Sequence, residues 1–559
     1  MIKKTNSYKG FETWFNGIRM ALKMHLYVFL AFFVIHIITA LTVTYFLQGK
    51  RYAVLGRYLL DSVKAGHMPD TYILRSYFDY LSVNFIYVLT FTAVVYCGCP
   101  FVIAMFKRKS KRQLETKHLR GARLVSAQEF ARQIGPGDLP FGSFRLPKQE
   151  EIKHCLTVGR PGAGKTVFLS QVTERLIERE AKAVVYDFNG GYVERFYDPR
   201  RDIIFNPLDR RSVEWNLFSD IKTKRDINVA ATSLIPPVYT GDTFRNDAAR
   251  EVFSGILHYL WRNNFKTNSD IWKGVAAPAK KIHEWLRITP EGQAGYRYIE
   301  DAGSRQTLSS VFAAMTQYAH AFQYMSHGDS AFSVTDWLSN DRPGFIFVTN
   351  QSDDTLKPIL SLFVDFLGKK LLSLPDDLKR RVFFLLDEFG TLQRLSSIQE
   401  LLIASGSKGG SCWIGIQDIR QLNNLYTPDA ADTIVNACCS SVIFAVSDPK
   451  TAKYLVDKIG DEEIIETEET FNMGVSNYRD GVSLTQREKR QRLILDSELM
   501  NLPDLHAYVK IPNNPSITLS KFEIRDYPAK EPSFIIKDEY ILEEVVQKQE
   551  ELIKQPVLP

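Results

Sequence analysis

Residues 159–166 read Gly159-Arg160-Pro161-Gly162-Ala163-Gly164-Lys165-Thr166, which is the complete pattern of a phosphate-binding loop. In such a loop the backbone N–H groups surround nucleotide phosphates, the lysine reaches the β and γ phosphates, and the hydroxyl holds Mg²⁺. The flanks agree, because residues 152–158 read as a strand that enters the loop and residues 167–179 have helical spacing. We therefore predict a nucleotide site in which Thr166 binds Mg²⁺ and the backbone through Val167 contacts the phosphates.

A second motif lies far downstream, where Arg381-Val-Phe-Phe-Leu-Leu-Asp-Glu388 is an apolar strand that ends in two carboxylates. Ligands of α/β sheets bind at the carboxyl ends of the strands. The motif therefore predicts that Asp387 organises Mg²⁺ through a water and that Glu388 orients an attacking water as general base. A plain helix-capping role for the two carboxylates is the alternative.

Two further apolar segments predict strands of the same sheet. Residues 183–188 end near Asp187 and are expected to form the second strand of a parallel nucleotide-binding sheet. Residues 412–417 are expected to lie beside the strand that carries Asp387. That position would direct Gln417 at the γ-phosphate as a sensor, whereas an ordinary glutamine at a strand end is the alternative.

The spacing of the motifs predicts an insertion, because 222 residues separate Lys165 from Asp387. A compact nucleotide-binding core needs far fewer. Residues 220–332 have helical composition, with the best periodicity in 246–262 and 313–324. We therefore predict an all-alpha domain over 220–332, inserted between two parts of a nucleotide-binding domain at 113–219 and 333–528.

The N-terminal part contains two long apolar runs, residues 25–47 and 85–106, each long enough to cross a bilayer as a helix. A signal peptide for the first run and a buried core helix for either run are the alternatives. Lysines and arginines precede the first run and follow the second. Both termini are therefore expected in the cytoplasm, and residues 48–84 on the other side of the membrane. Residues 1–112 are thus predicted to be a membrane anchor.

Two charged segments remain. Residues 107–123 hold eight lysines and arginines, which suit contact with anionic membrane lipid or, alternatively, with nucleic acid. Residues 529–559 are rich in acidic side chains and have one thin apolar stripe. They predict a solvated helix or flexible tail, or else a docking helix for a partner.

Taken together, the motifs resemble the TraD-type conjugative coupling proteins, which are membrane-anchored ATPases of type IV secretion systems related to the FtsK group of P-loop NTPases. The resemblance spans about residues 151–511. It is carried by Cys155 with residues 159–166, Tyr186-Asp187, Tyr197-Asp198-Pro199, Asn206-Pro-Leu-Asp209 with Trp215, Ser233-Leu-Ile-Pro236, Leu356-Lys-Pro358, Asp387-Glu388, Thr391-Leu392, Gly409-Gly410, Gly415-Ile-Gln417, Arg479-Asp-Gly-Val482 and Leu502-Pro-Asp-Leu505.

The resemblance implies an α/β RecA-like P-loop domain with an inserted all-alpha domain, anchored in the bacterial inner membrane by two N-terminal transmembrane helices. It also implies ATP and Mg²⁺ as cofactors and a homohexameric ring. The implied partners are single- or double-stranded DNA, relaxase and relaxosome proteins, and channel components of the secretion system. The implied function is to couple the relaxase–DNA complex to the channel and to drive or gate the transfer of single-stranded DNA.

Two alternatives remain open at this point. The chain could be an ATP-gated docking platform for secreted substrates without sustained motor activity. A chromosome-partitioning translocase of the FtsK kind would need four spans and a winged-helix domain, which the sequence does not indicate. One departure also matters. Members of the resembling family often carry an arginine shortly before the Gly-Gly pair, but residues 404–410 contain none. Lys408 or Arg394 could substitute, although a lysine lacks the two-pronged guanidinium, so the sequence does not identify the residue that acts in trans.

Overall fold

The computed structural model of the chain describes residues 50–68, 70–72, 74, 75 and 116–540, the last range without 240, 242, 302, 326–331, 352, 378 and 473–480, and isolated positions within 19–42 and 104–108. The chain divides into two units, residues 1–117 with 464–489, and residues 118–463 with 490–559. All of the predicted site residues belong to the second unit.

The first unit contains helix α2 (Lys50–Lys64) and most of a long hairpin. The hairpin is part of a three-stranded sheet with the order β1-β12-β13, whose strands are β1 (Lys117–Gly121), β12 (Asp461–Asn472) and β13 (Gly481–Arg492). Within the described residues, no helix has the length and apolarity to cross a membrane. The first predicted span, residues 25–47, is described only in part, and the second, residues 85–106, lies almost entirely outside the described residues.

The second unit is built on a ten-stranded sheet with the order β2-β15-β14-β11-β5-β10-β9-β6-β8-β7. Neighbours from β11 to β7 are parallel, and β14 pairs antiparallel with both β11 and β15. The strands are β2 (Arg123–Val125), β5 (Cys155–Val158), β6 (Lys182–Asp187), β7 (Ile203–Phe205), β8 (Gly344–Thr349), β9 (Val382–Leu386), β10 (Gly410–Ile416), β11 (Ser440–Ile443), β14 (His506–Lys510) and β15 (Ser516–Lys521).

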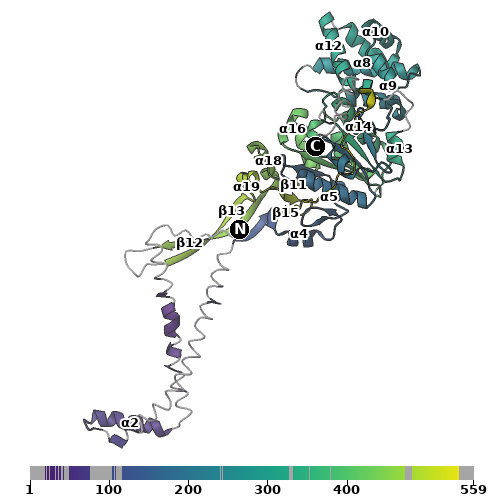
Figure 1. The fold of residues 1–559 in the computed structure, drawn as a ribbon. Helices are drawn as coiled ribbons and strands as arrows, with labels where there is room; N and C mark the ends of the chain where they lie inside the picture. Colours follow the sequence, from purple (N-terminus) through teal and green to yellow (C-terminus); the bar gives the residue numbers. More distant parts are fainter. Residues whose placement is uncertain are drawn as a thin grey trace, which may run out of the picture. The chain divides into compact units, whose positions relative to one another are not determined.

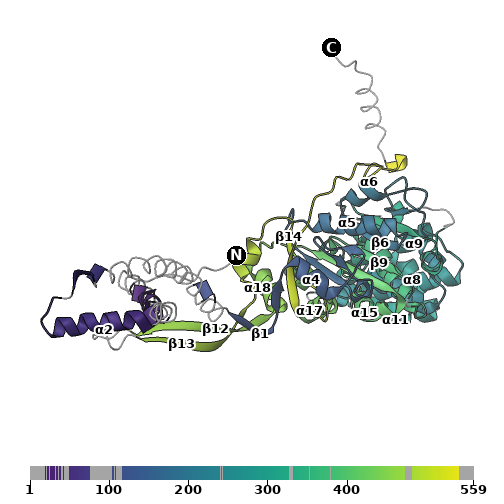
Figure 2. The same cartoon turned by 90° about the horizontal axis from the view of Figure 1, so that it is seen from below.

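The central strands are buried along their whole length, as their continuous apolar sequences require in a parallel sheet covered on both faces. Figure 2 shows helices α5 and α6 on one face of this sheet and helices α15 and α17 on the other. The helices that follow or cover the sheet are α4 (Ala127–Ile134), α5 (Lys165–Glu178), α6 (Gly191–Phe196), α13 (Val334–Ser339), α14 (Lys357–Ser373), α15 (Ile398–Ala404), α16 (Ile419–Leu425), α17 (Pro428–Ala437), α18 (Pro449–Ile459) and α19 (Asp496–Met500).

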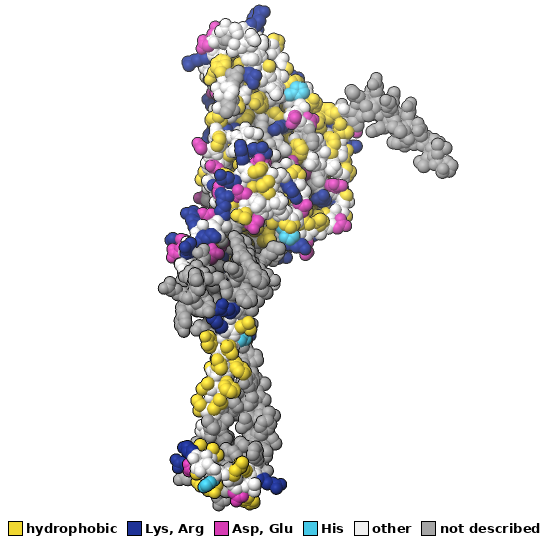
Figure 3. Space-filling view, turned by 90° about the vertical axis from the view of Figure 1, so that its left-hand side faces the viewer, with side chains coloured by type: hydrophobic (Ala, Val, Ile, Leu, Met, Phe, Trp, Pro, Cys, Tyr) yellow, Lys and Arg dark blue, Asp and Glu magenta, His cyan; other side chains and the backbone are white. Residues whose placement is uncertain are grey.

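The chain between β7 and β8 forms the predicted inserted helical domain, which gathers at one end of the unit in Figure 1. Its central helix α8 is buried on all sides over residues 252–258 and packs against the helices around it. The insertion contains α7 (Lys224–Leu234), α8 (Thr243–Arg262), α9 (Asn268–Val275), α10 (Ala279–Ile288), α11 (Gln293–Glu300) and α12 (Arg305–Ala319), with short 3₁₀ turns between them. On the face that Figure 3 shows, basic and acidic side chains are interspersed over the second unit.

Two predictions about the ends of elements need correction. The strand that enters the loop begins at Cys155 instead of Ile152, because residues 151–153 form a 3₁₀ turn and His154 has a φ of 56°. Residues 530–540 do not form a solvated tail or a helix from end to end. Their backbone is held by hydrogen bonds, including Lys530 N to Glu194 O (2.7 Å) and Lys537 N to Leu208 O (3.0 Å). Residues 541–559 lie outside the described part of the chain.

Candidate active site

The loop of residues 159–164 joins β5 to α5 and has a backbone that only glycine adopts easily at two positions. Gly162 has a φ of 77° and Gly164 a φ of 121°, both of which are positive. The amide of Arg160 donates to Ala445 O at 2.7 Å, which fixes the start of the loop to the chain that follows β11. Helix α5 then begins at Lys165, so the N–H groups of its first turn face the interior of the loop.

Lys165 is buried, with 7% of its surface exposed, and its ammonium lies inside the loop. Lys165 Nζ donates to Gly159 O at 2.8 Å. Burial lowers the pKa of Lys165, while the charges of Asp387 and Glu388 oppose this shift. The loop thus holds a cation at the position where the sequence pattern predicts contact with phosphate oxygens.

Asp387 connects the loop with the second motif. Thr166 Oγ1 donates to Asp387 Oδ2 at 3.0 Å, and the Tyr192 hydroxyl donates to the same oxygen, also at 3.0 Å. Burial raises the pKa of Asp387, whereas Lys165 and the two hydroxyl donors lower it. Among the described residues, the other oxygen, Oδ1, is buried and has no hydrogen-bond partner. A hydroxyl and a carboxylate with one unused oxygen are the donor set that Mg²⁺ or its bound water requires.

Glu388 and Gln417 lie together at the same edge of the sheet. They follow β9 and β10, which are adjacent and parallel, with Ile414 opposite Leu386, as the sequence predicted. Burial and the neighbouring charge of Asp387 raise the pKa of Glu388, while Lys165 and a hydrogen bond from the Gln417 side chain lower it. The Gln417 side chain thus lies near the carboxylate of Glu388. The predicted role of Gln417 as a γ-phosphate sensor stays a prediction.

One residue of this site, Tyr192, is absent from the sequence predictions, and a second, Asp187, was predicted only as the end of a strand. Tyr192, in the first turn of α6, supplies a hydroxyl to Asp387. The helix is placed by Asp187, whose carboxylate accepts the backbone N–H groups of residues 190–193 at 2.7–3.1 Å. Burial and the charge of Asp387 raise the pKa of Asp187, to about 6, against the lowering by these donors. The Gly190-Gly191 turn after the strand was a sequence signal for the cap, but a buried tyrosine alone is typical of a core.

The segment Leu502-Pro-Asp-Leu505 also lies against the loop. Leu505 N donates to Ala163 O at 2.9 Å, and Arg160 and Asp504 form an ion pair at 2.9 Å. Leu505 has a φ of 62°, an uncommon value for a residue with a branched side chain. The sequence singled out this segment only through its resemblance, and the structure places it in contact with the phosphate-binding loop.

The two residues suggested to act in trans lie in different surroundings. Lys408 forms an ion pair with Asp376 at 2.7 Å. It precedes the amino end of β10, whereas Gln417 follows the carboxyl end of the same strand. Arg394 lies between two tyrosine rings, with its guanidinium carbon 4.2 Å from the ring centre of Tyr239 and 5.2 Å from that of Tyr426.

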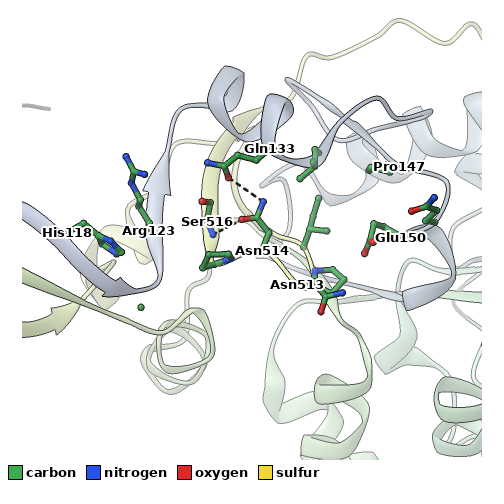
Figure 4. A pocket seen from close by; sticks show the side chains of 14 residues that line it. His118, Arg123, Gln133, Pro147, Glu150, Asn513, Asn514 and Ser516 are labelled. Carbon is green, nitrogen blue, oxygen red and sulfur yellow. Dashed lines mark hydrogen bonds between the residues drawn. The ribbon is translucent and has the colours of Figure 1, made fainter.

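A separate cavity of about 610 Å³ lies away from these residues, between α4 and the loop before β15. Figure 4 shows Asn514 pointing toward Gln133, and the two amides are hydrogen-bonded at 3.4 Å. Asn514 Oδ1 also accepts Ser516 N–H at 2.9 Å. None of the predicted site residues lines this cavity.

The parallel sheet, the glycine-rich loop at the start of α5 and the carboxylates after β9 define a RecA-like P-loop nucleotide-binding protein with an inserted helical domain. The chain matches the family described as type IV secretion-system coupling protein DNA-binding domain over residues 138–522, and it belongs to that family.

Relatives agree with this assignment. The coupling protein TraD of Escherichia coli is 29% identical over 466 residues, which cover 80% of this chain and 64% of TraD. Protein VirD4 of Rhizobium radiobacter is 24% identical over 471 residues, covering 78% of this chain and 67% of VirD4. The chain thus spans about two thirds of the length of these curated relatives.

Solved structures of the plasmid coupling protein TrwB have the same fold. The complex of TrwB with ADP and Mg²⁺ matches with a TM-score of 0.67 and 26% identity, covering 75% of this chain and 98% of that chain. The unbound monoclinic form of the bacterial conjugative coupling protein TrwBdeltaN70 matches with a TM-score of 0.68 and 25% identity, covering 75% of this chain and 96% of that chain.

Proposed function

We propose that this chain binds ATP with Mg²⁺ and hydrolyses ATP at the edge formed by β5, β9 and β10. The observation that carries the proposal is the contact between Thr166 and Asp387, because it joins two motifs 221 residues apart into one cation site. The unused oxygen of Asp387 supports the same assignment. TrwB, which matches over three quarters of this chain, is known in complex with ADP and Mg²⁺ and with a non-hydrolysable ATP analogue.

In this proposal each group has a defined task. The loop N–H groups and Lys165 hold the phosphates, while Thr166 and Asp387 hold the metal. Bound Mg²⁺ supplies charge that offsets the negative charge developing on the transferred phosphoryl group. Glu388 accepts a proton from the attacking water, and its raised pKa makes its carboxylate a stronger base than an exposed glutamate. Gln417 lies near Glu388 at the end of the adjacent strand and would help to orient the Glu388 carboxylate.

We further propose that hydrolysis serves the transfer of DNA in conjugation. The family assignment over residues 138–522 supports this, as do the relatives named as coupling proteins. The partners would be single- or double-stranded DNA, relaxase and relaxosome proteins, and inner-membrane components of the secretion channel. Residues 25–47 and 85–106 would anchor the chain in the bacterial inner membrane with both termini in the cytoplasm. A homohexameric ring would place the catalytic edge of one subunit against its neighbour.

The proposal is tested by measuring the ATPase rate of the full chain against protein concentration, with and without single-stranded DNA. We expect a cooperative dependence on protein concentration and stimulation by DNA. Glu388→Gln should lower the stimulated rate about 10²- to 10⁴-fold while ATP still binds. Lys165→Ala should abolish turnover in a protein that still inserts in the membrane.

Two outcomes would contradict parts of the proposal. Full ATPase activity in Lys165→Ala would remove the site assignment. A stoichiometric burst of hydrolysis that DNA does not accelerate would favour an ATP-gated docking platform over a motor.

A further inference from the structure

A second site lies beside the catalytic edge, where the chain enters the inserted helical domain. A cavity of about 270 Å³ is bounded by residues 236–239, which connect α7 to α8, and by the chain from Asn423 to Pro428. Tyr239, Tyr318, Arg394 and Tyr426 provide its aromatic and cationic walls. We call it the Tyr239 pocket.

The walls of the Tyr239 pocket form a continuous stack. The rings of Phe389 and Tyr426 are parallel within 9°, with their centres 6.0 Å apart. The guanidinium of Arg394 lies over both tyrosine rings. Its carbon is 5.2 Å from the ring centre of Tyr426 and 4.2 Å from that of Tyr239. The inner members are fixed, because Tyr426 is 4% exposed and its hydroxyl accepts Leu395 N–H at 3.0 Å. The outer member is open, since Tyr239 is 58% exposed.

The chemistry of the lining selects a flat, electron-rich group without positive charge. Among the described residues, Arg394 Nε is buried and has no hydrogen-bond partner, so a stacked cation keeps an unused donor. Within the part of the chain that the structure describes, no aspartate or glutamate lines the cavity, while the exposed residues Asn423 and Asn424 lie at its rim. Aromatic and arginine faces with nearby amides are the means by which proteins hold unpaired bases.

The volume of the cavity limits the class of ligand further. Pockets for drug-sized molecules have volumes of about 300–1,000 Å³, so a cavity of 270 Å³ fits one ring system and not a folded element. We propose that the Tyr239 pocket binds one unpaired base of single-stranded DNA, stacked on the face of Tyr239 that Arg394 leaves open. The inference rests on the proposed function, because it assumes that the chain handles DNA. It adds the place on the chain where a base is held.

The location gives such a base a direct path to the catalytic edge. Phe389, the innermost ring of the stack, follows Glu388 in the sequence and is buried. Thr391, at the end of the same 3₁₀ turn, donates through its hydroxyl to Glu388 O at 2.7 Å. A base on the open end of the stack would thus be linked to the turn that carries the general base through Arg394, Tyr426 and Phe389.

The experiment compares the affinity of the full chain for two fluorescent probes of equal length, a thymidine oligonucleotide and an abasic oligonucleotide with the same phosphates. Tyr239→Ala should weaken binding of the thymidine probe about tenfold and leave the weaker binding of the abasic probe unchanged, because one base stack is lost. Phe265→Ala is the matched control, since Phe265 is 48% exposed on the inserted domain and lies outside the pocket. It should bind both probes as the wild type does.

The possible failures are distinguishable. If the wild-type chain binds neither probe, the proposed function itself is contradicted. If the wild type binds the thymidine probe and Tyr239→Ala binds it equally well, the Tyr239 pocket is not a base site, and a peptide segment becomes the better candidate for its ligand. An equal loss of affinity for both probes would also overturn the inference, because it would show recognition of phosphate instead of a base.

Discussion

At the scale of single residues, the hydrogen bonds of the Asp387 carboxylate decide whether the site can hold a metal. Two hydroxyl donors share one of its oxygens, and only one of them belongs to a sequence motif. The other donor, Tyr192, comes from a helix that Asp187 positions through four backbone N–H groups. The orientation of the Asp387 carboxylate therefore depends on a residue outside both motifs.

This predicts a measurable effect of Tyr192→Phe. Loss of the hydroxyl removes one hydrogen bond to a charged group, worth about 1.5–3 kcal/mol, and frees the Asp387 carboxylate to turn. We expect the Mg²⁺ concentration for half-maximal ATPase to rise about tenfold with little change in the fold. Tyr454→Phe is the control, because its hydroxyl also bonds a carboxylate, Asp432 at 2.6 Å, far from the site. An unchanged Mg²⁺ dependence would show that Tyr192 has no part in holding the carboxylate.

A second residue-scale prediction concerns pH. Burial lowers the pKa of His154 to about 4, and its Nδ1 accepts Cys412 N–H at 2.9 Å, which requires a neutral ring. Between pH 6.5 and 4 the unfolded chain binds the proton and the folded chain does not. The free energy of unfolding therefore carries no penalty from His154 above pH 6.5. It falls as the pH falls from 6.5 toward 4, by about 3 kcal/mol in all.

The variant His154→Asn isolates this contribution. Asparagine tolerates the left-handed φ of 56° and offers a carbonyl oxygen to the same N–H group, but it does not titrate. We expect the fall in thermal midpoint between pH 7 and pH 5 to be smaller in the variant than in the wild type. Equal falls would show that His154 does not contribute to the acid sensitivity of the fold.

These residues also mark how far the sequence could predict the site. Lys165, Thr166 and Asp387 were predictable because the backbone of a phosphate-binding loop and the end of a buried strand place them without help from distant contacts. Tyr192 and His154 were not, since each acts through a partner about 195 and 258 residues away. Nothing in the local pattern separates Tyr192 from a core tyrosine.

At the scale of elements, the loop and helix α5 depend on two glycines that differ in their surroundings. A Cβ on Gly164 would meet Phe444 at 3.0 Å and Leu505 at 3.2 Å, while a Cβ on Gly162 would meet nothing within 4 Å. Both residues have positive φ, so both alanine variants carry backbone strain of roughly 1–2 kcal/mol, and Gly164, with the larger φ, lies further from the left-handed region that alanine can adopt. Only Gly164→Ala adds a packing conflict with the segment that contacts the loop.

The pair therefore tests whether residues 502–505 brace the loop. We expect Gly162→Ala to lower stability by about 1–2 kcal/mol and Gly164→Ala by about 2–5 kcal/mol, since overpacking adds 1–3 kcal/mol. Nucleotide affinity, measured by titration with a fluorescent ATP analogue, should fall further in Gly164→Ala. Equal effects of the two substitutions would mean that Leu505 and Phe444 yield without cost.

Element boundaries were predictable where sequence periodicity is long, as in helix α8, whose structure covers the predicted periodic stretch 246–262. They were less predictable beside tertiary contacts. Residues 152–154 were included in the predicted strand, yet they turn, because Glu151 is buried in an ion pair with Arg179 and His154 accepts a hydrogen bond from β10. Those partners lie outside any local window.

At the scale of the whole molecule, strands from distant parts of the sequence lie side by side in one ten-stranded sheet. The 222-residue gap between Lys165 and Asp387 revealed the inserted helices, because a nucleotide-binding sheet cannot be spread over that length without an insertion. The antiparallel strands β14 and β15 were not predicted, since they join the sheet only after residue 505, where β14 lies between β11 and β15. Their neighbours are set by the position of the loop, which residues 502–505 contact.

The last prediction concerns residues 530–540, which hold parts of the second unit that are distant in sequence. Arg210 N donates to Ile535 O at 2.7 Å, Lys537 N to Leu208 O at 3.0 Å, and the Tyr540 hydroxyl to Tyr324 O at 2.9 Å. The segment thus contacts both the turn after β7 and the last turn of the inserted helices. Each hydrogen bond contributes about 0.5–1.5 kcal/mol net, so the segment should stabilise the fold by a few kcal/mol.

Two truncations separate this contribution from that of the rest of the C-terminal region. Deletion of residues 541–559 keeps every one of these hydrogen bonds, whereas deletion of residues 530–559 removes them all and leaves the backbone near Leu208 without partners. We expect only the longer deletion to lower the thermal midpoint and to speed cleavage of the second unit in limited proteolysis. If both truncated chains melt and are cleaved as the full chain is, residues 530–540 contribute nothing to its stability, and their hydrogen bonds are fully replaced by water.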